Sequence, residues 1–194
     1  MTEANRAGNV ATMRRFVVVA ATVALLVAAT AVAAAAPHTI RWASGKVTSI
    51  GPMKTSGSPT LTRATRAFGT PSRTRLSGRE VCVVDWNALR LRANFVNLGA
   101  TPAGRTTCTA GVGKLQTATI RGTSFQTQRG LKIGDSIARL RALHPGARLR
   151  ERSWWLASAP NRFGGAGERI AIVRANTRAG KVVNFVLWIG AAGE

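Results

Sequence analysis

The chain has 194 residues, of which 28 are lysine or arginine and seven are aspartate or glutamate, so its formal net charge at pH 7 is +21. The chain also has two histidines and two cysteines, and they form no metal-ligand cluster or nucleophile–base pair with a plausible spacing. The sequence therefore predicts a protein that is not an enzyme and uses no metal or cofactor. The positive field favours polyanions as partners, although a coding bias towards arginine would give the same composition with solvated side chains.

Residues 1–36 predict a secretory signal peptide. Arg14 and Arg15 precede an apolar run over residues 16–36, and the run closes on small residues in an Ala-x-Ala arrangement that suits a signal peptidase. The protein is therefore expected to be secreted or extracytoplasmic.

An uncleaved membrane anchor is the alternative, because the 21 residues of this run could span a hydrocarbon core of about 30 Å. The chain would then be a single-pass protein, anchored at its N-terminus through residues 16–36. No cysteine follows the run directly, so a lipid-anchored start is not expected. The true start, at Met1 or at Met13, stays open because residues 1–12 add nothing to the signal pattern.

Residues 37–194 are expected to form a single exported domain, since a chain of this length can bury a core of its own. Removal of residues 1–36 takes away three arginines and one glutamate, which leaves a formal net charge of +19. In an exported chain, Cys82 and Cys108 are expected to form one disulfide worth about 3 kcal/mol, and two buried free thiols are the alternative.

An internal repeat runs through this domain. Residues 58–69 align without a gap on residues 134–145, at an offset of 76. In both segments a hydroxyl residue, Thr60 or Ser136, stands where its side chain can cap the first turn of a helix. Apolar residues recur after each cap at i, i+3 and i+6, which predicts two short helices with one buried stripe each.

Three strands are predicted after each helix, because apolar and polar residues alternate there. The predicted strands are 80–86, 89–95 and 114–121 in the first repeat, and 153–158, 169–175 and 181–190 in the second. Short, hairpin-linked strands of this kind favour antiparallel pairing.

The expected fold class is therefore α+β. Two tandem helix–three-strand repeats, about 46–125 and 126–190, would form one antiparallel sheet with both helices on one face. A strand at 46–50 would lead into the first repeat. Segments 37–45 and 159–168 are predicted to be mobile.

The segment GLKIGDSIARLRALHPGA, residues 130–147, resembles the Gly-x-Ser/Thr helix-start motif of the BamE (SmpA/OmlA) outer-membrane lipoproteins. Tandem copies in an exported, actinobacterial-type chain are similar to the beta-lactamase inhibitory proteins. The resemblance covers most of 46–190 in architecture and about twelve residues of each repeat as motif. The chain departs from these families: it has no lipid-attachment cysteine, one expected disulfide, and Ser58-Pro59 in place of Gly-x. Inhibition of a beta-lactamase is therefore not carried over.

The acids and histidines are placed for structural roles. Asp135 lies beside the start of the second helix, where the helix dipole stabilises a carboxylate. Glu80 and Asp85 are five residues apart on a predicted strand and would point to opposite faces. His144 stands at a helix end, where it would interact with the last carbonyls and the dipole.

The last strand is too apolar for a sheet with a solvated face. Val183, Phe185, Leu187 and Ile189 are expected to form its core face, which leaves Val182, Asn184, Val186 and Trp188 on the opposite face. The adjacent Trp154 and Trp155 would point to opposite sides, so one of them should face outward. Tryptophan and arginine are the anchors enriched in protein interfaces. The partner-binding candidates are Trp188, Val186, Asn184, Trp154, Trp155, Arg90 and Arg92.

The sequence thus predicts an exported, non-enzymatic binding module that holds an envelope or extracellular protein on the open face of its sheet, as an inhibitor or an assembly partner. No small-molecule substrate is evident. A basic polyanion binder at the cell envelope, for anionic wall polymer, lipid or nucleic acid, is the alternative. The tryptophans could also simply cover the edges of the core. The identity of the partner and the oligomeric state stay open.

Overall fold

The computed structural model describes residues 36–57, 59–97, 99, 101–161 and 164–190. These residues belong to one compact unit. The predicted signal peptide or anchor lies outside the described residues except for its last alanine. Within the described ranges, no helix is long and apolar enough to cross a membrane.

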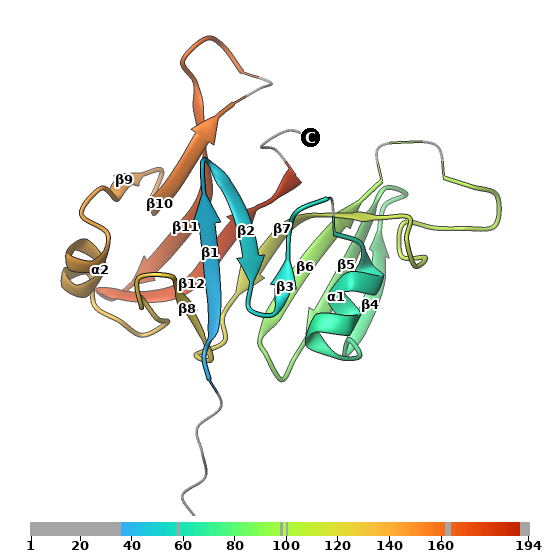
Figure 1. Ribbon diagram of the computed structural model, residues 1–194, viewed down its shortest axis with the longest axis horizontal. Helices are drawn as coiled ribbons and strands as arrows, with labels where there is room; N and C mark the ends of the chain where they lie inside the picture. The colour runs from blue at the N-terminus through green and yellow to red at the C-terminus, as the bar shows by residue number, and fades with distance from the viewer. Residues whose placement is uncertain (1–35, 58, 98, 100, 162–163, 191–194) are drawn as a thin grey trace, which may run out of the picture. The chain divides into compact units, whose positions relative to one another are not determined.

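Eight strands form the larger sheet, in the order β4-β5-β6-β7-β12-β11-β10-β9 (Figure 1). Every neighbouring pair is antiparallel. The central pair, β7 and β12, joins the strands that follow the first helix to those that follow the second. The strands are β4 (Arg73–Ser77), β5 (Val81–Trp86), β6 (Leu91–Val96), β7 (Lys114–Ile120), β9 (Arg148–Arg150), β10 (Ser153–Pro160), β11 (Arg169–Arg178) and β12 (Lys181–Trp188).

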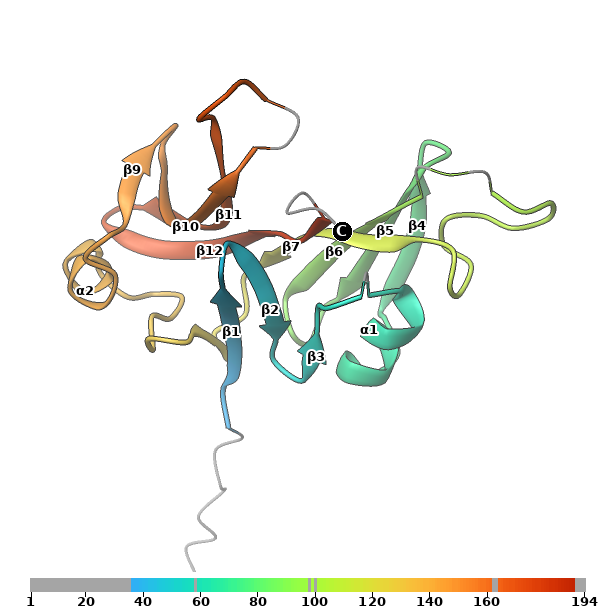
Figure 2. The ribbon, with the colours of Figure 1, turned by 45° about the horizontal axis from the view of Figure 1, so that its top comes forward.

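A smaller sheet has the order β3-β2-β1-β8 and pairs β1 with β8 in parallel. Its strands are β1 (His38–Ala43), β2 (Lys46–Ile50), β3 (Met53–Lys54) and β8 (Phe125–Thr127). Figure 2 shows β1, β2 and β3 on one side of the larger sheet. Most of the segment 37–45, predicted to be mobile, is therefore an ordered strand.

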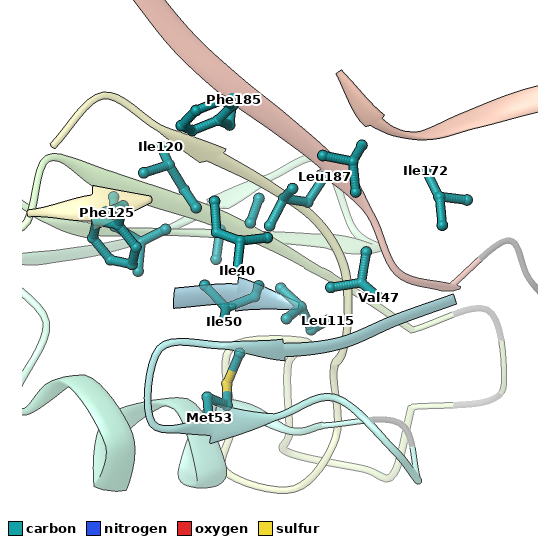
Figure 3. Packing of buried hydrophobic residues seen from close by; sticks show 14 of the residues in the cluster. Ile40, Val47, Ile50, Met53, Leu115, Ile120, Phe125, Ile172, Phe185 and Leu187 are labelled. Carbon is teal, nitrogen blue, oxygen red and sulfur yellow. The ribbon is translucent and has the colours of Figure 1, made fainter. Parts of the chain in front are cut away.

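Apolar side chains of the two sheets meet in one core (Figure 3). Ile40 and Ile50 come from the smaller sheet and face Leu115, Phe185 and Leu187 of the larger one. All five are at most 2% exposed. Burying a side chain of this size stabilises a fold by about 1.5–3 kcal/mol, so the contact between the sheets supplies a large part of the stability.

The helices are short. They are α1 (Leu61–Phe68) and α2 (Ile137–Leu143), and each buries one residue fully, Ala64 in α1 and Leu140 in α2. Ser136 caps α2, because its hydroxyl accepts the backbone N–H of Arg139 at 3.1 Å. Thr60 stands at the N-cap of α1, but its side chain makes no capping hydrogen bond.

The predicted fold class, two tandem helix–three-strand repeats in a single antiparallel sheet with both helices on one face, is wrong. The chain is mostly β, it has two sheets, and each helix is followed by four strands of the larger sheet. Two helices of eight and seven residues bury little apolar surface. The smaller sheet supplies the cover that the prediction assigned to the helices.

The predicted disulfide is confirmed: Cys82 of β5 is bonded to Cys108 in the loop between β6 and β7. The neighbouring Thr107 is buried, and its hydroxyl donates to the backbone carbonyl of Arg79 at 3.1 Å. The bond and this contact tie the β6–β7 loop to the sheet.

Candidate binding surface

The larger sheet has a second face, which points away from the core. Strand pairing assigns its residues, because directly paired side chains lie on the same side of a sheet. We call this surface the outer face. One row crosses all eight strands: Arg73, Asp85, Arg92, Thr119, Val186, Arg174, Trp155 and Arg148. A neighbouring row contains Arg75, Val83, Asn94, Thr117 and Trp188.

Of the seven residues predicted to contact a partner, five lie on the outer face. They are Asn184, Val186 and Trp188 of β12, Trp155 of β10 and Arg92 of β6. All five are half-buried or exposed. The structure thus brings together, on one face, side chains that are far apart in the sequence.

The other two lie elsewhere. Trp154 points into the core and is 6% exposed, with the guanidinium of Arg141 at 5.1 Å from its ring centroid. Arg90 lies in the turn between β5 and β6, with φ 48°. The strand predicted over 89–95 starts two residues later, at Leu91, so the alternation that placed Arg90 beside Arg92 ends at this turn.

The prediction for the start of β12 is also wrong. The register between β11 and β12 shifts between Asn176 and Thr177, so that Thr177 pairs with Val182. Val182 is consequently 1% exposed and belongs to the core, whereas Val183 is 37% exposed. A bulge breaks strict alternation, which is why the period-two reading exchanged these two valines.

Arginine dominates the charge of the outer face. In the rows defined by strand pairing, Asp85 is the single carboxylate among the described residues. It is 8% exposed and accepts hydrogen bonds from Arg92, at 2.6 Å from Nε and 3.3 Å from Nη2. The hydrogen bond and the negative charge of Asp85 raise the pKa of Arg92. Because this acid is already paired, the remaining arginines give the face a net positive charge.

Two tryptophans lie on the outer face with unused donors. The indole Nε1 atoms of Trp155 and Trp188 are buried and have no hydrogen-bond partner among the described residues. A buried donor left unpaired costs about 1–3 kcal/mol. Because neither nitrogen is accessible from the surface, a bound partner would contact the exposed parts of the two rings and not their N–H groups. The guanidinium of Arg150 also lies over Trp155, at 5.3 Å from its ring centroid.

Two hollows of about 320 Å³ each open beside these residues. The first lies at β9 and β10 and is lined by Arg148, Arg150, Trp155, Ser158 and Arg169, among others. The second lies at the β5–β6 turn and is lined by residues that include Asp85, Arg90, Arg92 and Arg121. We call them the β9–β10 pocket and the β5–β6 pocket.

The sequence reasoning missed the arginines of the β9–β10 pocket. Arg148 and Arg150 are two residues apart, and a turn separates them from Trp155. That spacing is the available signal, because residues i and i+2 of a strand point the same way. The spacing does not identify a strand by itself, because β9 has only three residues, too few to show an alternation.

Asp135 and His144 have structural positions at the ends of α2. The carboxylate of Asp135 accepts the backbone N–H of Lys132 at 2.8 Å and Arg139 Nε at 3.3 Å. His144 is buried, and desolvation, with a smaller effect of Arg129, lowers its pKa to about 4. It is therefore neutral at pH 7 and does not act on the helix dipole as a cation. Within the described ranges, no three His, Cys, Asp or Glu side chains gather as metal ligands do.

The sequence matches no protein-family model and no curated protein. Among solved structures, it is similar to an extracellular protein containing a SCP domain from Bacillus anthracis str. Ames, with a TM-score of 0.38 and 13% identity. The alignment covers 70% of this chain and 47% of the other, so the chain spans about half the length of that protein. A similarity at this level carries no argument about function. No family match supports the resemblance to BamE or to the beta-lactamase inhibitory proteins.

Proposed function

We propose that this protein is an exported, non-enzymatic binding module whose outer face holds an acidic protein of the envelope or the medium. The arrangement of the outer face carries the proposal. Uncharged side chains occupy the two central strands, Thr117 and Thr119 on β7 and Val186 and Trp188 on β12. Arginines occupy the strands on either side.

Protein interfaces are depleted of charged residues at their centre and have a polar rim, and tryptophan and arginine are enriched among their anchors. Trp188 is half-buried in the free protein, so a partner could cover the rest of its ring. The rim arginines would steer an acidic partner and set its orientation, because the single acid of the two rows is already paired with Arg92.

The disulfide supports an extracytoplasmic location. Disulfides persist in oxidising compartments, outside the cytoplasm. The excess of cations favours anionic partners.

The test is capture by the full chain from the medium and envelope of its host, followed by identification and purification of the captured protein. A wash at about 1 M salt reduces the screening length to about 3 Å and should remove partners held by charge alone. The dissociation constant is then measured for the wild type, for Trp188→Ala and for Leu149→Ala. Leu149 is the matched control, because it is 58% exposed but points away from the outer face.

We expect Trp188→Ala to weaken binding about 30-fold, equivalent to about 2 kcal/mol, and Leu149→Ala to leave it unchanged. Equal effects of the two variants would refute the outer face as the interface. Retention of polymers only, all lost in the salt wash, would instead favour a polyanion binder.

A further inference from the structure

The β9–β10 pocket concentrates positive charge around an indole. Arg148 pairs directly with Trp155 across the two strands, and the guanidinium of Arg150 lies 5.3 Å from the centroid of the same ring. Arg169 enters from β11 and is fixed by two hydrogen bonds to Ser158, from Nε to the hydroxyl at 3.0 Å and from Nη2 to the backbone carbonyl at 2.9 Å. No carboxylate lines the pocket among the described residues.

These three arginines have no counter-ion in the described part of the chain. The two ion pairs there join Arg92 to Asp85 and Arg139 to Asp135. Three guanidinium groups around one hollow repel each other, and an anion between them would remove that repulsion. The contacts that hold Arg150 on the indole and Arg169 on Ser158 fix two of the three donors before any ligand arrives, which lowers the entropy cost of binding.

The donor groups define the ligand. A guanidinium presents a planar fork of N–H groups that matches the two oxygens of a carboxylate or a phosphate. Arg169 uses Nε and Nη2 on Ser158, so its Nη1 remains for a ligand. The indole of Trp155 provides an apolar wall for the part of the ligand that carries the anion.

We propose that the β9–β10 pocket is an oxyanion-binding site, in which Arg148, Arg150 and Arg169 hold a carboxylate or phosphate group against the Trp155 indole. The oxyanion could belong to an acidic side chain of a protein or to a phosphate compound. This site can be tested independently of the proposed function, because binding of a small anion to the pocket needs no protein partner.

The β5–β6 pocket provides an internal comparison. It has the same volume of about 320 Å³ and is also lined by three arginines, Arg90, Arg92 and Arg121. However, the carboxylate of Asp85 lines it too and already accepts two hydrogen bonds from Arg92. This pocket therefore carries its own counter-ion, and we expect it to bind anions more weakly than the β9–β10 pocket.

The experiment is isothermal titration of the full chain with inorganic phosphate and, separately, with N-acetylglutamate, at about 0.15 M salt, where the diffuse field of the protein is screened beyond about 8 Å. The wild type is compared with the double variant Arg148→Gln/Arg169→Gln. The matched control is Arg90→Gln/Arg121→Gln, which removes the same charge from the β5–β6 pocket. Thermal unfolding of each variant checks that it is folded.

We expect one binding site in the wild type and an affinity at least tenfold lower in Arg148→Gln/Arg169→Gln, with a change below about twofold in the control. Arg148→Lys should also weaken binding, because lysine keeps the charge but loses the fork. Stronger binding of phosphate would assign the site to phosphate compounds, and stronger binding of N-acetylglutamate to acidic side chains. Equal losses in the two double variants, or no saturable binding of either anion, would overturn the proposal. Neither result would change the expected effect of Trp188→Ala on the affinity for a protein partner.

Discussion

Acid should destabilise this fold through His144. The ring is 4% exposed, stacks on Trp42 of β1 with centroids 5.7 Å apart, and has Nε2 3.0 Å from the hydroxyl of Thr127 in β8. It thus joins the end of α2 to the smaller sheet. Protonation would place a cation in this buried position, near the positive charge of Arg129, which is why the pKa falls to about 4.

The sign of the effect follows from where each state takes up the proton. The unfolded chain protonates this histidine near its ordinary pKa of about 6.5, and the folded chain only near pH 4. Between these values the unfolded state binds more protons, so the free energy of unfolding decreases as the pH falls. The contribution of the uncharged His144 ring to the free energy of unfolding is fully present above about pH 6.5 and is lost as the pH falls towards about 4.

The magnitude is about 3 kcal/mol, because a difference of about 2.5 pKa units corresponds to 1.36 kcal/mol for each unit. Such a loss is a large share of the stability of an ordinary domain, which is about 5–15 kcal/mol. Carboxylates also titrate in this range, so the wild type must be compared with a variant that lacks the titrating ring. His144→Gln keeps an amide that can bond to Thr127.

Urea unfolding of the two proteins between about pH 7.5 and pH 4 measures the effect. The difference in unfolding free energy between wild type and His144→Gln should change by about 3 kcal/mol over this interval, to the disadvantage of the wild type at low pH. Curves that stay parallel throughout would show that His144 has the same pKa in both states, and the reasoning would be refuted.

Three further changes test other parts of the structure. Replacement of both Cys82 and Cys108 by alanine opens a cross-link between residues 26 apart and should lower the free energy of unfolding by about 3.5 kcal/mol in urea denaturation; no loss would mean that the β6–β7 loop is held without the bond. Phe185→Ala removes a ring with no exposed surface from between the sheets and should cost about 3–5 kcal/mol in the same assay; a cost below 1 kcal/mol would contradict the tight packing of this core. Arg92→Ala leaves the carboxylate of Asp85 without its partner. Because the arginine side chain is 46% exposed, we expect the free energy of unfolding to fall by only about 1 kcal/mol, measured in a double-mutant cycle with Asp85→Asn. Additive effects of the two replacements would show that the pair is not coupled.

The clearest periodic segments were predictable. The strand expected at 46–50 has these bounds in the structure, and the helix behind Ser136 starts at the next residue, since a capping hydroxyl before an apolar stripe marks a helix start. The edge strands were not predicted. The residues of β4 and β9 are almost all exposed, so no buried face leaves a pattern in them. Their strand conformation comes from pairing with β5 and β10, which is a tertiary effect.

The candidate site was predictable to the extent that alternation holds. Val186 and Trp188 lie beyond the bulge in β12, and period two from the central residue Phe185 places them correctly on the outer face. Val182 lies on the other side of the bulge and was misplaced for that reason alone. The β9–β10 pocket depends on Arg169, which pairs with Pro160 from another strand, and no local pattern links these two positions.

The edges of the larger sheet also limit how a partner can bind. β4 carries Arg73 and Arg75, and β9 carries Arg148 and Arg150, so both edges present cations along their free backbone groups. Charged edge strands resist pairing with another strand. A protein partner should therefore lie across the outer face instead of extending the sheet. β7 and β12 are central and have no free edge. A partner that lies across the outer face should therefore lose affinity in Trp188→Ala and keep it after replacement of an edge residue such as Leu149. A partner that adds a strand to an edge of the sheet should not depend on Trp188.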